Sequence, residues 1–188
     1  VFCNILLADE INRGSPRTQS ALLECMNEMQ VSVEGTAHAL HAPFMVVATQ
    51  NPIEYHGTYP LPEAQLDRFA LRLAMGYPTR KQEVDLVKDQ RTRHPLQDIE
   101  PVAGIEEILD VRSRVRETVV EDSVLAYMTG IVRATREDSR LRLGASPRAT
   151  ATLYRCAQSL ACIGGRDFVT PDDVKALVPP VLAHRILP

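Results

Sequence analysis

Two adjacent carboxylates, Asp9 and Glu10, follow a nearly continuous apolar run over residues 1–8. Such a run is typical of a strand that is buried on both faces of a parallel sheet. Ligands bind outside the carboxyl ends of these strands. One acid can hold Mg²⁺ through water, and the next can orient a water that attacks a nucleoside triphosphate. The pair therefore indicates triphosphate hydrolysis, although a strand ending in an ordinary polar turn would look the same.

A second apolar run, residues 44–49, predicts another buried strand, which is followed by Asn51-Pro52. Because the carboxyl ends of parallel strands meet at one edge of the sheet, we expect Asn51 beside the two acids. An amide there can hold the attacking water or the terminal phosphate. The alternative interpretation is that Asn51 only begins a turn, as Asn-Pro often does.

Two arginines have the chemistry that such a site requires. Arg68 and Arg148 carry a permanent charge, and a guanidinium binds phosphate oxygens with paired hydrogen bonds. Each arginine alone is more often the partner of a surface ion pair. Together with Asp9, Glu10 and Asn51, in this order along the chain, they favour the triphosphate site.

The elements that must position these residues follow from periodicity and capping signals. Apolar spacing predicts a helix over residues 15–29 with Ser15 as its cap. We also expect a β-hairpin over 31–41, a long loop over 53–61, a short helix over 62–67 and a third strand over 69–74. The Gly76-Tyr77-Pro78 turn then ends the first domain, which we place at residues 1–77.

The remainder, residues 78–188, shows helical patterns and no strand pattern. Helices are predicted from Thr79, over 104–118, from the caps Asp122 and Ser146, and from Thr170 to Pro179-Pro180. We expect these helices to form a small bundle. The predicted fold class is therefore α/β, with a parallel-sheet core that carries a β-hairpin insertion, followed by an all-α domain.

Composition limits the remaining possibilities. Of the 188 residues, 45% are hydrophobic and 24% are charged, which is ordinary for a globular protein. The net charge of −3 argues against an electrostatic nucleic-acid binder. No apolar stretch is long enough for a membrane span and no signal peptide is visible, so we expect a cytoplasmic protein. The four cysteines lack Cys-x-x-Cys spacing, which predicts free thiols rather than disulfides or a metal site.

The order and wording of these motifs resemble the MoxR family of AAA+ ATPases. The resemblance covers essentially the whole chain, and its most specific stretch is the one from Gly57 to Phe69. It rests on Ala8-Asp9-Glu10-Ile11-Asn12-Arg13, Thr18-Gln19-Ser20-Ala21-Leu22-Leu23-Glu24, Ala48-Thr49-Gln50-Asn51-Pro52, Leu66-Asp67-Arg68-Phe69, Ala145-Ser146-Pro147-Arg148 and Val169-Thr170-Pro171-Asp172-Asp173-Val174. It implies a partial AAA+ core of the P-loop NTPase type and a helical lid.

The resemblance also implies roles. Asp9 and Glu10 look like the Walker B pair, in which Asp9 holds Mg²⁺ through water and Glu10 is catalytic. Asn51 resembles sensor 1, Arg68 resembles an arginine finger that reaches the nucleotide of a neighbouring subunit, and Arg148 resembles a sensor 2 that binds ATP. The hairpin resembles the pre-sensor-1 hairpin. Relatives of this kind assemble rings, often hexamers, and act on client protein complexes with partners that contain von Willebrand factor A domains. Neither nucleic acid nor a membrane span is implied.

One departure from the family pattern keeps alternatives open. The sequence contains no Gly-x-x-x-x-Gly-Lys-[Ser/Thr] phosphate loop, and it starts inside a core strand. We therefore expect a fragment that is inactive by itself, whereas the complete protein would be an ATPase. One alternative is a relative of magnesium chelatase or of replicative helicases. The other is a non-hydrolysing module for oligomerisation or partner binding.

Overall fold

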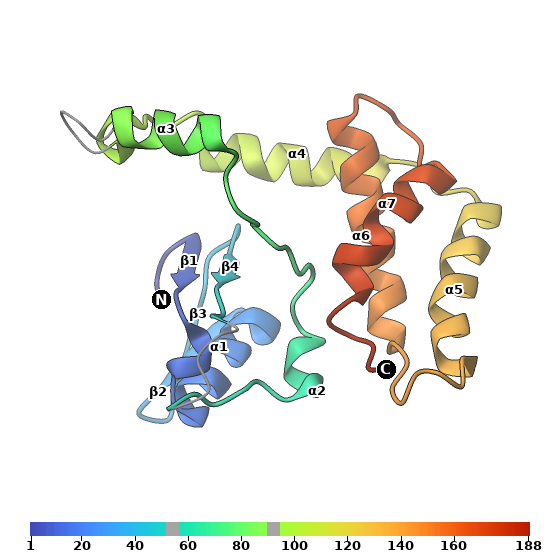
Figure 1. The fold of residues 1–188 in the computed structure, drawn as a ribbon, viewed down its shortest axis with the longest axis horizontal. Helices are drawn as coiled ribbons and strands as arrows, with labels where there is room; N and C mark the ends of the chain where they lie inside the picture. Colours follow the sequence, from blue (N-terminus) through green and yellow to red (C-terminus); the bar gives the residue numbers. More distant parts are fainter. Residues whose placement is uncertain (52–56, 90–94) are drawn as a thin grey trace.

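The computed structural model describes residues 1–51, 57–89 and 95–188. Its first part contains a pair of parallel strands, β1 (Ile5–Ala8) and β4 (Met45–Ala48), with Leu6 opposite Val46 (Figure 1). The parallel pairing that the two apolar runs predict is thus confirmed. It brings the residues that follow both strands to the same edge of the sheet.

One face of this sheet is partly buried and the other is exposed. Leu6 and Val46 pack with a buried cluster that includes Leu22 of helix α1 (Pro16–Glu28). The alternate side chains Ile5, Leu7, Met45 and Val47 are 43–65% exposed. The prediction of strands buried on both faces is therefore wrong for this chain, because α1 covers one face and the side chains of a strand alternate between the two.

The helix and the hairpin next to the sheet form as predicted. The Ser15 hydroxyl caps α1 by accepting a hydrogen bond from the Thr18 amide at 3.2 Å. Strands β2 (Gln30–Val33) and β3 (Thr36–Ala39) pair antiparallel. Their turn has left-handed backbone at both Glu34 and Gly35, as a type I′ hairpin turn requires. A small buried cluster of Cys25, Val31 and Leu40 fixes the hairpin to α1.

The short helix α2 (Glu63–Leu66) follows Pro62 as expected, but the third strand is absent from the described residues. The segment after Ala70 leaves the sheet, and the Arg72 amide donates to the Pro180 carbonyl at 2.8 Å. Leu73, Met75 and Tyr77 are 73–98% exposed. The alternating pattern at 69–74 therefore predicted the wrong structure, because a strand forms only where a neighbour accepts its ladder of hydrogen bonds.

The second part is helical, as predicted. Helices α5 (Asp122–Glu137), α6 (Pro147–Ile163) and α7 (Pro171–Leu182) enclose a core whose fully buried side chains include Met128, Val132, Leu153, Val174 and Val181. Two predicted boundaries are wrong. Asp122 is the first helical residue after the cap Glu121, and α7 continues through Pro179 and Pro180 to Leu182.

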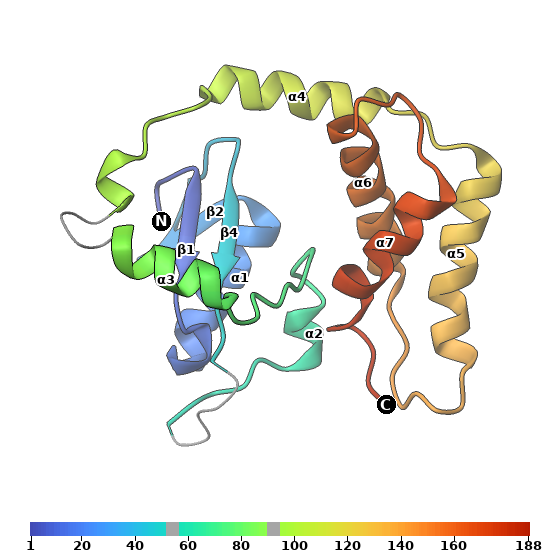
Figure 2. The ribbon, with the colours of Figure 1, turned by 45° about the horizontal axis from the view of Figure 1, so that its top comes forward.

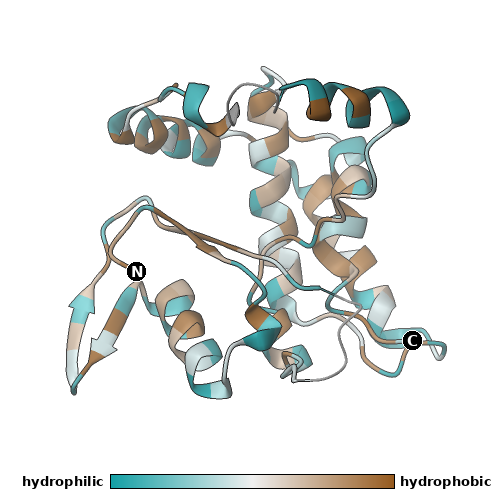
Figure 3. Ribbon diagram, turned by 60° about the vertical axis from the view of Figure 1, so that its left-hand side comes forward, coloured by the Kyte–Doolittle hydropathy of each residue, from teal (hydrophilic) through white to brown (hydrophobic). Residues whose placement is uncertain are grey.

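Two further helices extend away from this core. They are α3 (Arg80–Asp89) and α4 (Ile105–Glu117), and the 3-10 turn η2 (Pro95–Asp98) precedes α4 (Figures 1 and 2). Hydrophobic residues recur among the hydrophilic ones along these helices (Figure 3). Several of them are exposed, with Val87 at 65% and Ile105 at 53%. The carboxyl end of α4 is held by Gln158, whose side chain donates to the Thr118 carbonyl at 2.7 Å. The bundle therefore consists of α5–α7 and this end of α4.

None of the helices that the structure describes combines the length and apolar character needed to cross a bilayer. The cysteines are free thiols, of which Cys25 is buried and Cys3 is exposed.

Candidate functional site

The carboxyl end of β1 is fixed by Thr49, the residue after β4. The Thr49 hydroxyl donates to Asp9 Oδ1 and accepts from the Glu10 amide at 2.9 Å. The Thr49 amide and carbonyl add hydrogen bonds to Ala8 and Ile11, both at 3.0 Å. Asp9 and Glu10 are thereby held together at the edge where ligands of parallel sheets bind. Sequence reasoning assigned no role to Thr49, although it lies inside a motif that we quoted.

Glu10 has an unusual backbone conformation. Its φ and ψ are 49° and 52°, a left-handed geometry that is uncommon for a residue with a Cβ. Such strain persists only where the surroundings over-determine it, and it occurs most often at functional sites. The Glu10 carboxylate pairs with Arg13 Nε at 3.1 Å, and both side chains are more than one-third exposed. Exposed pairs of this kind contribute only about 0.2–1 kcal/mol, so the carboxylate can exchange partners readily.

Asn51 follows β4 at the same edge, next to two buried amide side chains, Asn12 and Gln19. Its carbonyl accepts from the Asn12 side chain at 3.4 Å, and Asn12 is 8% exposed. The buried Gln19 side chain donates to the Ile11 carbonyl at 3.2 Å and to the Tyr59 carbonyl at 2.8 Å. These contacts tie the turn after Glu10 to the segment that starts at Gly57. The predicted loop over 53–61 lies partly outside the described residues.

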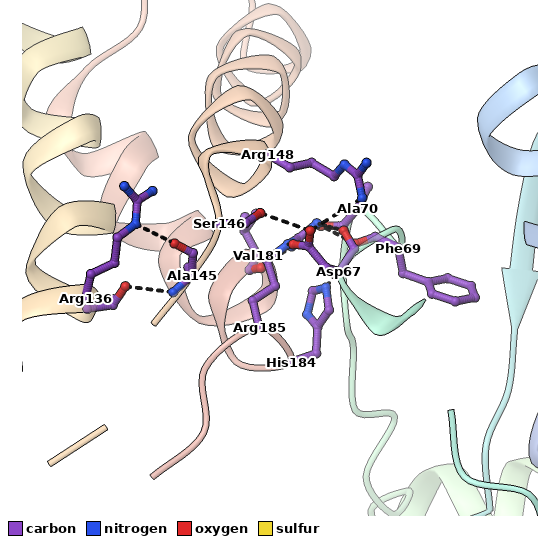
Figure 4. A network of polar contacts seen from close by, with 11 residues as sticks. Asp67, Phe69, Ala70, Arg136, Ala145, Ser146, Arg148, Val181, His184 and Arg185 are labelled. Carbon is purple, nitrogen blue, oxygen red and sulfur yellow. Dashed lines mark hydrogen bonds and ion pairs between the residues drawn. The ribbon is translucent and has the colours of Figure 1, made fainter. Parts of the chain in front are cut away.

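The two predicted arginines do not contact Asp9 or Glu10. Arg148 belongs to the first turn of α6, and its Nη1 lies 3.4 Å from Asp67 Oδ2 (Figure 4). The Ser146 hydroxyl donates to the same oxygen at 2.9 Å. Arg68 is exposed, and among the described residues its guanidinium has no hydrogen-bonded or ionic partner. Asp67, which precedes Arg68, is therefore the acid that joins the first part of the chain to the bundle.

Arg185 completes this cluster, and sequence reasoning missed it. Its side chain is 1% exposed, and its Nε donates to Asp67 Oδ1 at 2.9 Å. Neighbouring His184 is also buried, and its Nε2 lies 2.9 Å from the Phe69 carbonyl oxygen (Figure 4). Burial lowers the pKa of His184 below its ordinary value, and the positive charges of Arg185 and Arg72 act in the same direction. No local pattern marks His184 or Arg185, because most of their partners lie more than a hundred residues earlier in the sequence.

The donors at the sheet edge fit Mg²⁺ better than a metal with protein-only ligands. Within residues 1–51, 57–89 and 95–188, no three His, Cys, Asp or Glu side chains converge on one point. Mg²⁺ uses one or two carboxylates and takes its remaining oxygens from water and phosphate. Asp9 is exposed, and its Oδ1 is oriented by Thr49, so it meets that requirement.

Comparisons with known proteins agree with this geometry. Residues 1–71 match the ATPase family associated with various cellular activities (AAA), and residues 133–188 match the AAA lid domain. Residues 72–132 are matched by neither; we assigned 72–77 to the first domain and 78–132 to the lid domain.

Three relatives extend the match to the whole chain. The chain is 48% identical to YeaC of Bacillus subtilis over 187 residues, covering all of this chain and 58% of YeaC. It is 39% identical to Chaperone MoxR1 of Mycobacterium tuberculosis, covering all of this chain and 52% of MoxR1. The crystal structure of a protein from Cytophaga hutchinsonii, titled a "putative ATPase", superposes with a TM-score of 0.92 at 36% identity, over all of this chain and 59% of that one. The chain therefore belongs to the MoxR-type AAA+ ATPases, and it spans about half the length of the curated relatives that it matches.

Proposed function

We propose that the whole protein hydrolyses ATP with Mg²⁺ and couples hydrolysis to the remodelling or maturation of protein complexes. The observation that carries this proposal is the Asp9-Glu10 turn, which Thr49 braces at the carboxyl edge of the parallel strands. The coupling to other proteins is supported by the name of the chaperone MoxR1, to which the chain is 39% identical. We place this activity in the cytoplasm, in keeping with the free cysteines.

Each residue at the edge has a separate task. Asp9 would hold Mg²⁺ through water, and the bound ion would offset the negative charge of the phosphates. Glu10 would leave Arg13 and orient the attacking water, and Asn51 would hold that water or the terminal phosphate from the neighbouring strand. The 188 residues contain no phosphate loop, so the proposal requires one elsewhere in the whole protein. The coding sequence before Val1 can be read to find it.

The arginines would act at the boundaries of each subunit. Arg148 would move from Asp67 to the γ-phosphate held by its own subunit, and exposed Arg68 would reach the nucleotide of the next subunit in a ring, which we propose is a hexamer. Proteins with von Willebrand factor A domains are the proposed partners. A chelatase-like or helicase-like relative is less well supported, because the chain is 39% identical to a protein named MoxR1. A non-hydrolysing module would have no use for the braced acid pair.

Subunit mixing tests this proposal. Whole-protein subunits with Glu10→Gln and others with Arg68→Ala are prepared separately, and each should lack turnover. A mixed ring contains interfaces where an intact Glu10 faces an intact Arg68 from its neighbour, so mixing should restore part of the ATPase activity. Co-assembly is shown first, with a tag on one variant that captures the other. Co-assembled rings that stay inactive at every mixing ratio would refute an Arg68 that acts between subunits.

A further inference from the structure

Arg185 holds the backbone on both sides of Arg68. In addition to its bond with the Asp67 carboxylate, its Nη2 donates to the carbonyls of Asp67 at 3.2 Å and Phe69 at 2.6 Å. Its Nη1 donates to the Ala70 carbonyl at 3.2 Å and to the Val181 carbonyl in α7. Arg185 therefore contacts Asp67, Phe69 and Ala70, and it leaves out only Arg68 within this stretch.

This arrangement is rigid for a physical reason. Every N–H of a guanidinium can donate, and here each of the five donates to an acceptor within the protein (Figure 4). The side chain is 1% exposed, so any bond that it lost could not be replaced by bulk water. A displacement of the 67–70 backbone would leave a buried charge with unpaired donors. The backbone of this segment is thus locked to the end of α7.

Arg68 itself takes no part in the contacts that Arg185 makes with residues 67–70. It is exposed, whereas the Phe69 side chain packs with the cluster beneath the strands. With its neighbours fixed to the bundle on one side and to the sheet on the other, the Cα of Arg68 is held where the two domains meet. The direction in which Arg68 projects therefore depends on where the bundle sits relative to the sheet.

We propose that Arg185 is the positioning residue for Arg68. The lid of one subunit would thereby fix the position of the arginine that reaches the nucleotide of the next subunit. The proposal rests on the function proposed above for Arg68. Arg185 touches no substrate and acts only through the backbone of residues 67–70. Lysine at this position would keep the charge. Its ammonium group, however, lacks the planar set of donors with which the guanidinium bonds several carbonyls at once.

The test introduces Arg185→Lys into one of two kinds of subunit in mixed rings of the whole protein: the subunit that donates Arg68 or the subunit that accepts it. The donor subunit carries Glu10→Gln, so its Arg68 serves its neighbour while its own site is inactive. The acceptor subunit carries Arg68→Ala and keeps Glu10. Arg185→Lys in the donor should lower kcat of the mixed ring by about tenfold to a hundredfold with KM for ATP unchanged, because displacement by about 1 Å can cost a factor of a hundred. The same change in the acceptor should leave kcat within about threefold.

Controls separate positioning from general damage. Arg136→Lys is the matched control, because Arg136 Nε donates to the Ala145 carbonyl at 2.7 Å inside the bundle and contacts none of residues 67–70. It should leave kcat unchanged in either subunit. If Arg185→Lys subunits do not assemble, Asp67→Ala is used in the same two placements, since it removes the Nε acceptor and leaves Arg185 present. The donor placement must again be the more damaging one.

The outcomes distinguish this inference from the proposed function. If the parent mixture of Glu10→Gln and Arg68→Ala subunits shows no ATPase activity, the proposed function fails first. If the parent mixture is active, equal losses in donor and acceptor would show a merely structural role for Arg185. An active mixture with no loss in the donor placement would overturn the inference outright.

Discussion

Arg148 Nη1 lies 3.4 Å from Asp67 Oδ2, so the lid arginine with the proposed phosphate role is already paired with an acid of the other domain. The Arg148 side chain is 52% exposed and that of Asp67 is 19% exposed. An ion pair this open contributes at most about 1 kcal/mol. A triphosphate can therefore compete for Arg148 at low cost, whereas the buried bond between Arg185 and Asp67 is not open to such exchange.

Asp67→Asn in the whole protein should tighten ATP binding by up to about fivefold, which is the equivalent of about 1 kcal/mol. Asparagine keeps an oxygen for Arg185 Nε but no longer attracts Arg148 with a charge. Titration with Mg-ATP measures the effect. In an Arg148→Ala background the same substitution should give no tightening. Equal tightening in both backgrounds would show that Asp67 acts through something other than Arg148.

Thr49→Val should lower ATPase activity by about tenfold to a hundredfold, the usual cost of removing a group that orients a metal ligand. Valine has nearly the same shape but cannot donate to Asp9 or accept from the Glu10 amide. Thr49→Ser keeps the hydroxyl and is the matched control, with activity within about threefold of wild type. The Mg²⁺ dependence of kcat measures the loss. Equal activity of the valine and serine variants would show that the hydroxyl does not support the acid pair.

The stability of the domain junction should fall in mild acid because of His184. The pKa of His184 in the folded protein lies below its unfolded value, chiefly because burial disfavours the charged ring. The Phe69 carbonyl and the Asp67 carboxylate raise this pKa, whereas the positive charges of Arg185 and Arg72 lower it further. Between the two pKa values the unfolded chain binds more protons, so stability is complete above about pH 6.5 and is lost as pH falls. The slope from this residue cannot exceed about 1.4 kcal/mol per pH unit.

Urea unfolding between pH 5 and 8 measures this slope, with His184→Gln as the control. Glutamine can still donate to the Phe69 carbonyl but does not titrate, so the variant should lose this part of the pH dependence. Identical pH profiles for wild type and variant would exclude His184 as the source.

Local signals in the sequence predicted most of the elements. The Ser15 cap, the Glu34-Gly35 turn and the Thr170 capping box each satisfy backbone groups within a few residues, so a short stretch of sequence is enough to predict them. The position of Asp9 and Glu10 was also predictable. The apolar run predicts the strand, and residues that follow a parallel strand lie at the carboxyl edge of its sheet. The family roles of Asn51, Arg68 and Arg148 came from resemblance and remain predictions.

The features that were missed depend on distant neighbours. An alternating pattern over 69–74 has no strand beside it, and Arg72 instead bonds to Pro180 in the bundle. The helix α7 continues through two prolines because its buried residues Val181 and Leu182 complete the core. Arg185 finds four of its five acceptors 115–118 residues earlier in the sequence. Periodicity, which reads only a few neighbouring positions, cannot detect such contacts.

The most direct test of the central claim compares Glu10→Gln with wild type in the whole protein. Glutamine keeps the shape of Glu10 but cannot act as a base or as a negative group that polarises water. We predict that Mg-ATP binding is retained within about threefold while turnover falls by about a hundredfold or more. Single-turnover hydrolysis and equilibrium ATP binding are measured on the same preparation. Turnover close to wild type in the Glu10→Gln variant would contradict the account.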